Sequence, residues 1–172
     1  LLSLRRPADQ YGLSLILGGA EVRLAEVTEF YARMAACYQA GDSVAGVAEG
    51  FPLRDRVALY RTFEAMRRVN RPDQLDVSRV ASAQDIAWKT GTSYGARDAW
   101  AVGLTPRYVV GVWVGNAQGN GAPGLTGAHT AGPILFDLFN LLPASEWFAP
   151  PGPTEGVAAT VCTRSGHRAG KA

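Results

Sequence analysis

The sequence predicts an α+β fold in which helices pack on an antiparallel sheet. Helical periodicity occupies much of the first half of the 172 residues, three strand-like segments follow, and a strongly apolar helix comes after them. The connections between the strand-like segments are too short for a parallel crossover. Neighbouring strands are therefore expected to run antiparallel.

The composition is that of a globular domain, with 47% hydrophobic and 19% charged residues. No apolar run reaches the roughly 18 residues that a membrane-spanning helix needs. The formal net charge is only +2. It provides no basic surface of the kind that binds nucleic acid, so nucleic acid is not expected as a partner.

The first half of the chain is expected to be helical after a short apolar opening. Residues 1–20 contain an apolar stretch closed by two glycines, for which a strand and a buried loop both remain open. Residues 21–38 repeat apolar side chains with helical spacing, and Gly41 is placed to end that helix. A second helix is predicted over residues 55–69.

The second half begins with the sheet. Strands are predicted over residues 85–90, 98–103 and 108–115, the last of them rich in β-branched and aromatic residues. This third strand is apolar on both faces. We therefore expect other elements to cover it from both sides.

A glycine-rich loop (residues 116–129) separates the sheet from a helix predicted over residues 132–142, with Pro133 in its first turn. This helix is apolar on nearly every face, so it is expected to be buried. Residues 149–154 read as a stiff, proline-rich linker, and residues 155–172 as the start of a truncated further domain.

The chain has two cysteines, Cys37 and Cys162, in different segments. A buried thiol and an exposed one are expected rather than a disulfide bridge.

Two segments resemble phosphate-binding motifs but lack features that those motifs need. Residues 119–124 match G-x-G-x-x-G, but Pro123 removes an amide and the next helix starts too late to meet a pyrophosphate. Lys89 and Thr90 lack the preceding glycines of a P-loop.

Lys89, Thr90 and Gly91 carry the strongest chemical signal. They lie at the end of a predicted strand, and a short turn then leads to the next strand at Asp98. The tripeptide matches the K-T-G element of serine acyltransferases that act on D-alanyl peptides and β-lactams. Its position at a strand end, ahead of an antiparallel neighbour, makes a chance match improbable.

With its surroundings, the motif resembles the transpeptidase domain of class A penicillin-binding proteins. Residues 161–166 resemble the opening of a small C-terminal domain found in one subgroup of that family. The main resemblance extends over nearly the whole chain and is carried by five segments, residues 12–38, 86–95, 97–103, 108–116 and 133–137.

The resemblance implies that residues 1–148 are the C-terminal portion of a penicillin-binding, serine β-lactamase-like transpeptidase domain, incomplete in this chain. It implies a parent protein that is a peptidoglycan DD-transpeptidase, cross-linking D-Ala-D-Ala stem peptides and binding β-lactam antibiotics. It places that parent at the periplasmic face of the bacterial inner membrane, with an anchor outside this chain. It implies no cofactor and no metal ion.

Lys89 and Thr92 are the expected catalytic residues, and Thr90, Gly91, Thr92 and Tyr94 the expected substrate-binding ones. Side chains alternate along a strand, so the two threonine hydroxyls point the same way and Lys89 points to the other side. By resemblance, the hydroxyls bind the terminal carboxylate of the peptide or drug and the Thr92 amide serves the oxyanion hole.

The other two motifs of such a site, S-x-x-K and S-x-N, do not occur in the 172 residues. The serine nucleophile is expected upstream in the parent, and the isolated chain is expected to be inactive. Two alternatives stay open: a non-catalytic relative that binds cell-wall peptides, and a serine β-lactamase.

Overall fold

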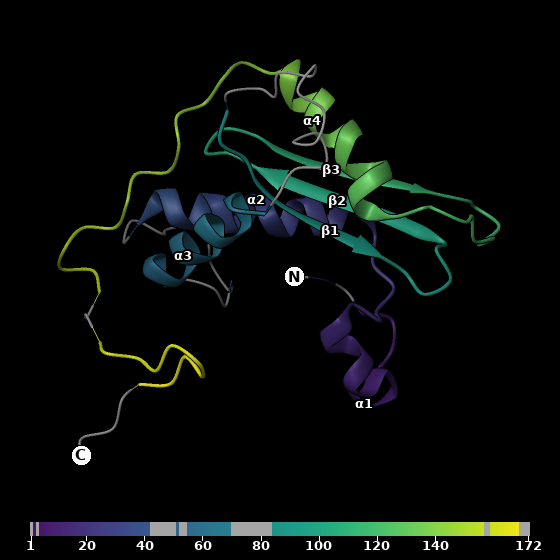
Figure 1. The fold of residues 1–172 in the computed structure, drawn as a ribbon, viewed down its shortest axis with the longest axis horizontal. Coiled ribbons are helices and arrows are strands. Elements are labelled where there is room, and N and C mark those ends of the chain that lie inside the picture. Colours follow the sequence, from purple (N-terminus) through teal and green to yellow (C-terminus); the bar gives the residue numbers. More distant parts are fainter. Residues whose placement is uncertain are drawn as a thin grey trace.

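The structure is a computed structural model that describes Leu2 and residues 4–41, 51, 55–69, 84–156 and 159–168. Three strands, β1 (Ala87–Thr92), β2 (Asp98–Leu104) and β3 (Val109–Gly115), form an antiparallel sheet in chain order (Figure 1). The predicted α+β class, the three strands and their antiparallel pairing are confirmed in this part of the chain.

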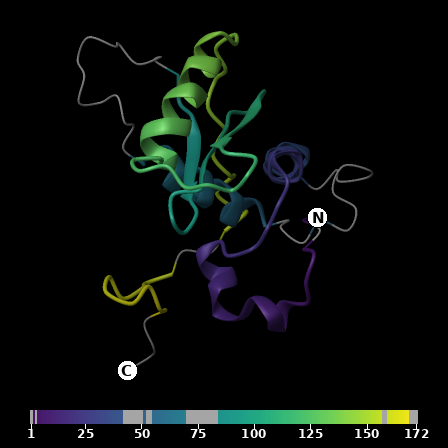
Figure 2. The same cartoon turned by 90° about the vertical axis from the view of Figure 1, so that its right-hand side faces the viewer.

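Helices lie on both faces of the sheet, as Figure 2 shows for α2 and α4. On one face, Ala87 and Leu104 join a core with side chains of α2 (Leu24–Ala40) and α3 (Arg56–Arg67). On the other face, Trp88 packs with side chains of α4 (Gly132–Asn140). The sheet therefore separates two apolar cores, and the expectation that β3 is covered from both sides is confirmed.

Helix α2 lies very close to β3 because Gly111 has no side chain. A Cβ atom at Gly111 would collide with the Thr28 hydroxyl and lie 3.1 Å from Leu24 Cδ1. The helix ends at Gly41, which has a positive φ of 56°. Both predicted helices of the first half are thus present, and Gly41 ends the first as expected.

Helix α3 is fixed to the start of the sheet. Asp55 caps its first turn by accepting a hydrogen bond from the Ala58 amide at 3.0 Å. Just past its other end, the Val69 carbonyl accepts a hydrogen bond from Trp88 Nε1 at 3.1 Å. Because Trp88 immediately precedes Lys89, this bond ties α3 to the strand that carries the motif.

Helix α4 corrects one prediction. It follows a single π-helical turn, η3 (Gly127–Ala131), and Pro133 lies in its first turn as expected. However, Ile134, Leu138 and Leu141 are exposed by 41%, 39% and 82%. The helix buries only its sheet-facing side, because no element within the described residues packs on its outer side.

The N-terminal segment is neither a strand nor a buried loop, the two structures that its sequence leaves open. It forms a short helix, α1 (Ala8–Tyr11), followed by a 3₁₀ helix, η1 (Gly12–Leu17). Leu13 and Ile16 are exposed by 84% and 82%, so the apolar stretch is not buried either. The Tyr11 hydroxyl donates to Glu21 at 3.0 Å and closes this segment onto the start of α2.

The chain after α4 returns across α2 and α3; we call residues 147–155 the C-terminal strap. The ring of Phe148 packs between those of Tyr38 and Phe63, with centroid distances of 5.4 and 4.7 Å. The Tyr38 hydroxyl donates to the Ala149 carbonyl, and Glu155 pairs with Arg56 at 3.1 Å. Residues 149–154 thus run between two anchors, and their role as a domain boundary stays a prediction.

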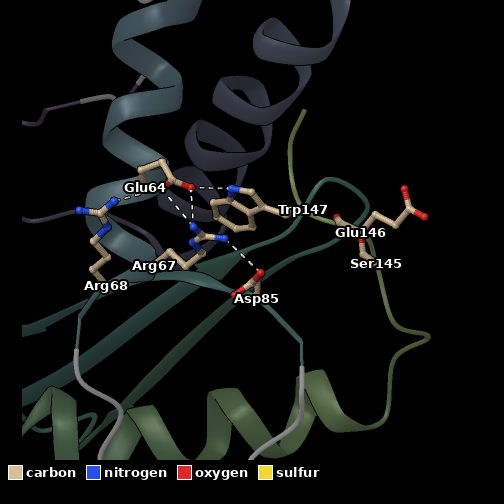
Figure 3. Close-up of polar contacts among 7 residues, drawn as sticks. All are labelled: Glu64, Arg67, Arg68, Asp85, Ser145, Glu146 and Trp147. Carbon is tan, nitrogen blue, oxygen red and sulfur yellow. Dashed lines mark hydrogen bonds and ion pairs between the residues drawn. The ribbon is translucent and has the colours of Figure 1, made fainter. Parts of the chain in front are cut away.

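Figure 3 shows the polar contacts that hold the start of the strap. Glu64 of α3 accepts a hydrogen bond from Trp147 Nε1 at 2.7 Å and pairs with Arg67 at 3.0 Å. Arg67 also pairs with Asp85 at 3.1 Å, and its guanidinium lies 4.7 Å from the centre of the Trp147 ring. The strap, α3 and the entry to β1 therefore meet in one network.

The cysteines agree with the prediction, because Cys37 is buried, Cys162 is exposed and no disulfide joins them. In the described part of the chain, no helix is both long and apolar enough to cross a membrane.

Candidate functional site

The whole motif lies within β1. Lys89, Thr90, Gly91 and Thr92 pair in antiparallel register with Val102, Ala101, Trp100 and Ala99 of β2. β1 is the first strand of the sheet, and no described strand lies on its other side. The motif therefore sits on an edge strand, whose outer backbone groups can pair with another extended chain.

The motif's side chains divide between the two faces of the sheet. Trp88 belongs to the core beneath α4, and Thr90 and Thr92 follow it on that face at two-residue steps. Ala87 belongs to the core with α2 and α3, so Lys89 lies on that opposite face. The predicted division of hydroxyls and ammonium is present in the strand.

Lys89 is exposed, and its ammonium donates a 2.6 Å hydrogen bond to the Thr90 carbonyl. It borders an open cavity of about 480 Å³ between β1 and α3. Arg61 also borders it, and no acidic residue contributes to its lining, so the local charge favours an anion. The remaining lining residues are Thr62, Ala65, Met66 and Val69.

A larger groove, of about 720 Å³, lies elsewhere, between α2 and the start of β3. Its lining is mainly the alanines of α2 together with residues of the turn between β2 and β3. None of the predicted site residues borders it. We therefore assign the candidate site to β1, which carries the lysine and threonine side chains of the motif, and not to the larger groove.

Thr92 has a specific backbone partner. Its hydroxyl oxygen accepts a hydrogen bond from the Gly127 amide at 2.9 Å. Gly127 begins η3, so the glycine-rich loop returns to the end of β1 just before the helical segment starts. The loop also contacts the turn after β1, where the Ala122 amide donates to the Ala96 carbonyl at 3.0 Å.

Tyr94 lies in the turn after β1 and is 96% exposed. The turn itself is well held, because Ser93 Oγ accepts from the Asp98 amide at 2.8 Å and Asp98 accepts from Trp113 Nε1 at 2.9 Å. The structure thus brings Lys89, Thr90, Gly91 and Thr92 together but leaves Tyr94 pointing into solvent. Its role in substrate binding stays a prediction.

Two long-range features near β1 are not evident from the sequence. In the sequence, Gly127 falls in the predicted glycine-rich loop, where a glycine needed for close approach cannot be told from any other loop glycine. The network of Glu64, Arg67, Asp85 and Trp147 joins segments far apart in the chain. Only the threonine before Gly127, a residue type favoured at helix starts, hinted at the first of them.

The described residues contain no group of three or more His, Cys, Asp or Glu side chains that could hold a metal ion. The polar groups of the site are hydroxyls, amides and one ammonium. This set can bind and polarise an anionic acyl compound.

Comparison with known proteins finds relatives that are all penicillin-binding proteins. The chain is 34% identical over 160 residues to penicillin-binding protein 1C of Escherichia coli, a match that covers 90% of this chain and 20% of that protein. It is 36% identical over 81 residues to penicillin-binding protein 1A of Aquifex aeolicus, and 34% identical over 84 residues to penicillin-binding protein 1B of Haemophilus influenzae.

The matches to the Aquifex aeolicus and Haemophilus influenzae proteins cover 43% and 48% of this chain, respectively, and 11% of each relative. The chain thus spans one-fifth or less of the length of the relatives it matches. No protein-family model matches the sequence, and no solved structure matches it.

Proposed function

This chain is a relative of the class A penicillin-binding proteins, and from that premise we propose that it forms the K-T-G side of a peptidoglycan DD-transpeptidase site within a longer protein. One observation supports this most. Lys89–Thr92 lies intact on an edge strand, with the hydroxyls on one face and the ammonium on the other.

The proposed substrate is a stem peptide that ends in D-Ala-D-Ala. Thr90 and Thr92 lie on the same face of β1, roughly 7 Å apart at the rise of a strand. Their hydroxyls would donate to the terminal carboxylate, and hydrogen bonds to an ionised acceptor are the stronger kind. Gly91 leaves room for the peptide backbone to lie against the strand.

Lys89 would stabilise the negative charge that develops in the reaction. A serine oxygen attacks the carbonyl of the penultimate D-alanine, the terminal D-alanine leaves, and an amine of a second stem peptide then takes the acyl group. The ammonium favours the negative charge that develops during acylation, and the Thr92 amide would be one oxyanion donor. Thr92 and Lys89 are therefore the proposed catalytic residues on this strand.

The serine that this mechanism needs must come from outside the 172 residues, because no S-x-x-K or S-x-N sequence occurs within them. We propose that the parent protein supplies both. The isolated chain should then take up no β-lactam covalently, and a stable adduct on it would contradict this.

The test is intact mass spectrometry of the longest native polypeptide that contains this segment, before and after benzylpenicillin. A drug-sized mass gain is expected, together with a large fall in labelling rate for Lys89→Ala. Arg107→Ala is a matched control, because Arg107 is an exposed cation at the opposite end of the strands.

The outcome also separates the alternatives. A mass gain that disappears as the drug is hydrolysed catalytically would indicate a β-lactamase. No gain on folded protein would indicate a relative that binds cell-wall peptides without catalysis. A gain that Lys89→Ala leaves unchanged would remove Lys89 from the site.

A further inference from the structure

The contact between Gly127 and Thr92 has no role in the mechanism proposed so far. The Gly127 amide donates to the Thr92 hydroxyl across the face of the sheet at 2.9 Å. Gly127 is buried, whereas Thr92 is exposed. One side of the hydroxyl is thus engaged by the protein and the other side remains open to a ligand.

Only glycine permits this approach. A Cβ atom at position 127 would lie 2.5 Å from the Gly91 carbonyl oxygen and 2.6 Å from the Trp100 carbonyl oxygen. Backbone atoms of a paired sheet have little freedom to move away. A side chain at position 127 would therefore push the amide away from the Thr92 hydroxyl.

The segment around Gly127 is held in place by its own hydrogen bonds. Thr126 Oγ1 accepts from the His129 amide at 3.3 Å, and Thr130 Oγ1 accepts from the Thr126 amide at 3.4 Å. The Gly127 carbonyl accepts from the Gly132 amide, which closes the π-helical turn. Such turns are rare and occur often at functional sites.

We infer that Gly127 is a positioning residue that turns Thr92 into a directed hydrogen-bond donor for a carboxylate. A hydroxyl has one proton and two lone pairs. With one lone pair taken by the Gly127 amide, the proton is kept away from Gly127 and can be donated on the exposed side. A hydrogen bond to an ionised acceptor is stronger than one to a neutral carbonyl, so this orientation favours acyl donors with a free terminal carboxylate. The inference rests on the proposed function, because it concerns the substrate of that site.

The first test compares acylation of the longest native polypeptide by benzylpenicillin and by its methyl ester, which lacks the negative charge. In Thr92→Val, the ratio of the acid rate to the ester rate should fall at least roughly tenfold, the effect of losing one hydrogen bond to a charged group. Thr92→Ser keeps the hydroxyl and should preserve much of the ratio. Gly127→Ala should lower the ratio as Thr92→Val does.

The second test is hydrogen exchange of the Gly127 amide in the same polypeptide. Exchange should speed up in Thr92→Val and stay slow in Thr92→Ser. This pair decides the matter if Gly127→Ala fails to fold. Equal acid-to-ester ratios in Thr92→Val and Thr92→Ser, with wild-type labelling intact, would overturn the inference.

The two proposals fail in different ways. If the wild-type polypeptide is not labelled at all, the transpeptidase proposal fails, and the exchange experiment still tests the Gly127–Thr92 bond. If labelling is normal but exchange at Gly127 is the same in Thr92→Val as in wild type, the bond is absent and only the positioning role is lost.

Discussion

At the scale of single residues, Glu64 joins three parts of the molecule. Its side chain is only 12% exposed, and it contacts Trp147 of the C-terminal strap together with Arg67 and Arg68 of its own helix. Arg67 continues the contact to Asp85, just before β1 (Figure 3). A largely buried carboxylate with this many hydrogen-bond donors is satisfied, but Trp147 and Arg67 in turn depend on it as their acceptor.

Replacing Glu64 by alanine should therefore destabilise the longest native polypeptide that contains this segment by about 1–3 kcal/mol, because Trp147 Nε1 and Arg67 lose their acceptor. Glu29→Ala is the matched control. Glu29 pairs with Arg33 on the exposed side of α2 at 2.7 Å, and such pairs contribute at most about 0.5 kcal/mol. Urea unfolding of both variants checks this, and equal losses would show that the network is unimportant.

The Cys162 thiol offers a pH test. Hydrogen bonds from the Ser165 side chain and from the Ser165 and Arg164 backbone favour its thiolate and lower its pKa. Alkylation of Cys162 by iodoacetamide should therefore reach half its maximal rate below the pH usual for a free thiol. Ser165→Ala should move that midpoint upward. A profile that the substitution leaves unmoved would contradict the assignment, and Cys37, which is buried, should react only after unfolding.

At the scale of elements, the C-terminal strap belongs to the core between α2 and α3. Phe148 is 3% exposed and contacts the rings of Tyr38 and Phe63, although it follows α4 in the chain. Leu141, at the end of α4, is 82% exposed. Apolar side chains of similar kind thus have opposite environments within a few residues of each other.

Phe148→Ala should cost about 3–5 kcal/mol, because a buried aromatic ring is lost and a cavity remains. Leu141→Ala should change stability by less than about 0.5 kcal/mol, as exposed substitutions usually do. Thermal unfolding of the longest native polypeptide can compare the two. If both variants melt like wild type, the strap is not part of the core.

At the scale of the whole molecule, the described part of the chain leaves apolar surface unpartnered. The outer face of α4 exposes Ile134, Leu138 and Leu141, and the outer edge of β3 pairs with no described strand. Such an edge is a template for pairing with another chain.

We therefore predict that the isolated chain self-associates and lacks a sharp thermal transition. Sedimentation velocity should show species larger than the 18.3 kDa monomer. Leu138→Lys with Leu141→Lys should reduce association, whereas Leu13→Lys with Ile16→Lys, at equally apolar positions of the N-terminal segment, should reduce it less. A monomer that unfolds cooperatively would contradict the prediction.

How far the sequence predicts this molecule depends on the range of the contacts involved. Helices α2, α3 and α4 and the three strands follow from periodicity, which is local, and the K-T-G residues are adjacent in the chain, so both were predictable. The helical N-terminal segment was not predicted. The contacts of Gly127 with Thr92 and of Trp147 with Glu64 join distant residues, and no local pattern encodes them. The exposed outer face of α4 was mispredicted because hydrophobicity shows what a helix can bury but not which neighbours are present.

The strap also has a consequence for synthesis on the ribosome. Trp147 reaches its partner Glu64 across 83 residues of chain. At the usual rates of translation, roughly 4–17 s pass between the appearance of α3 and the appearance of the residues that close its core. During that interval the part of the core between α2 and α3 that Phe148 fills stays open, although the sheet residues that share this core have already been made. The nascent chain is thus most dependent on chaperones before the segment that follows α4 has been made.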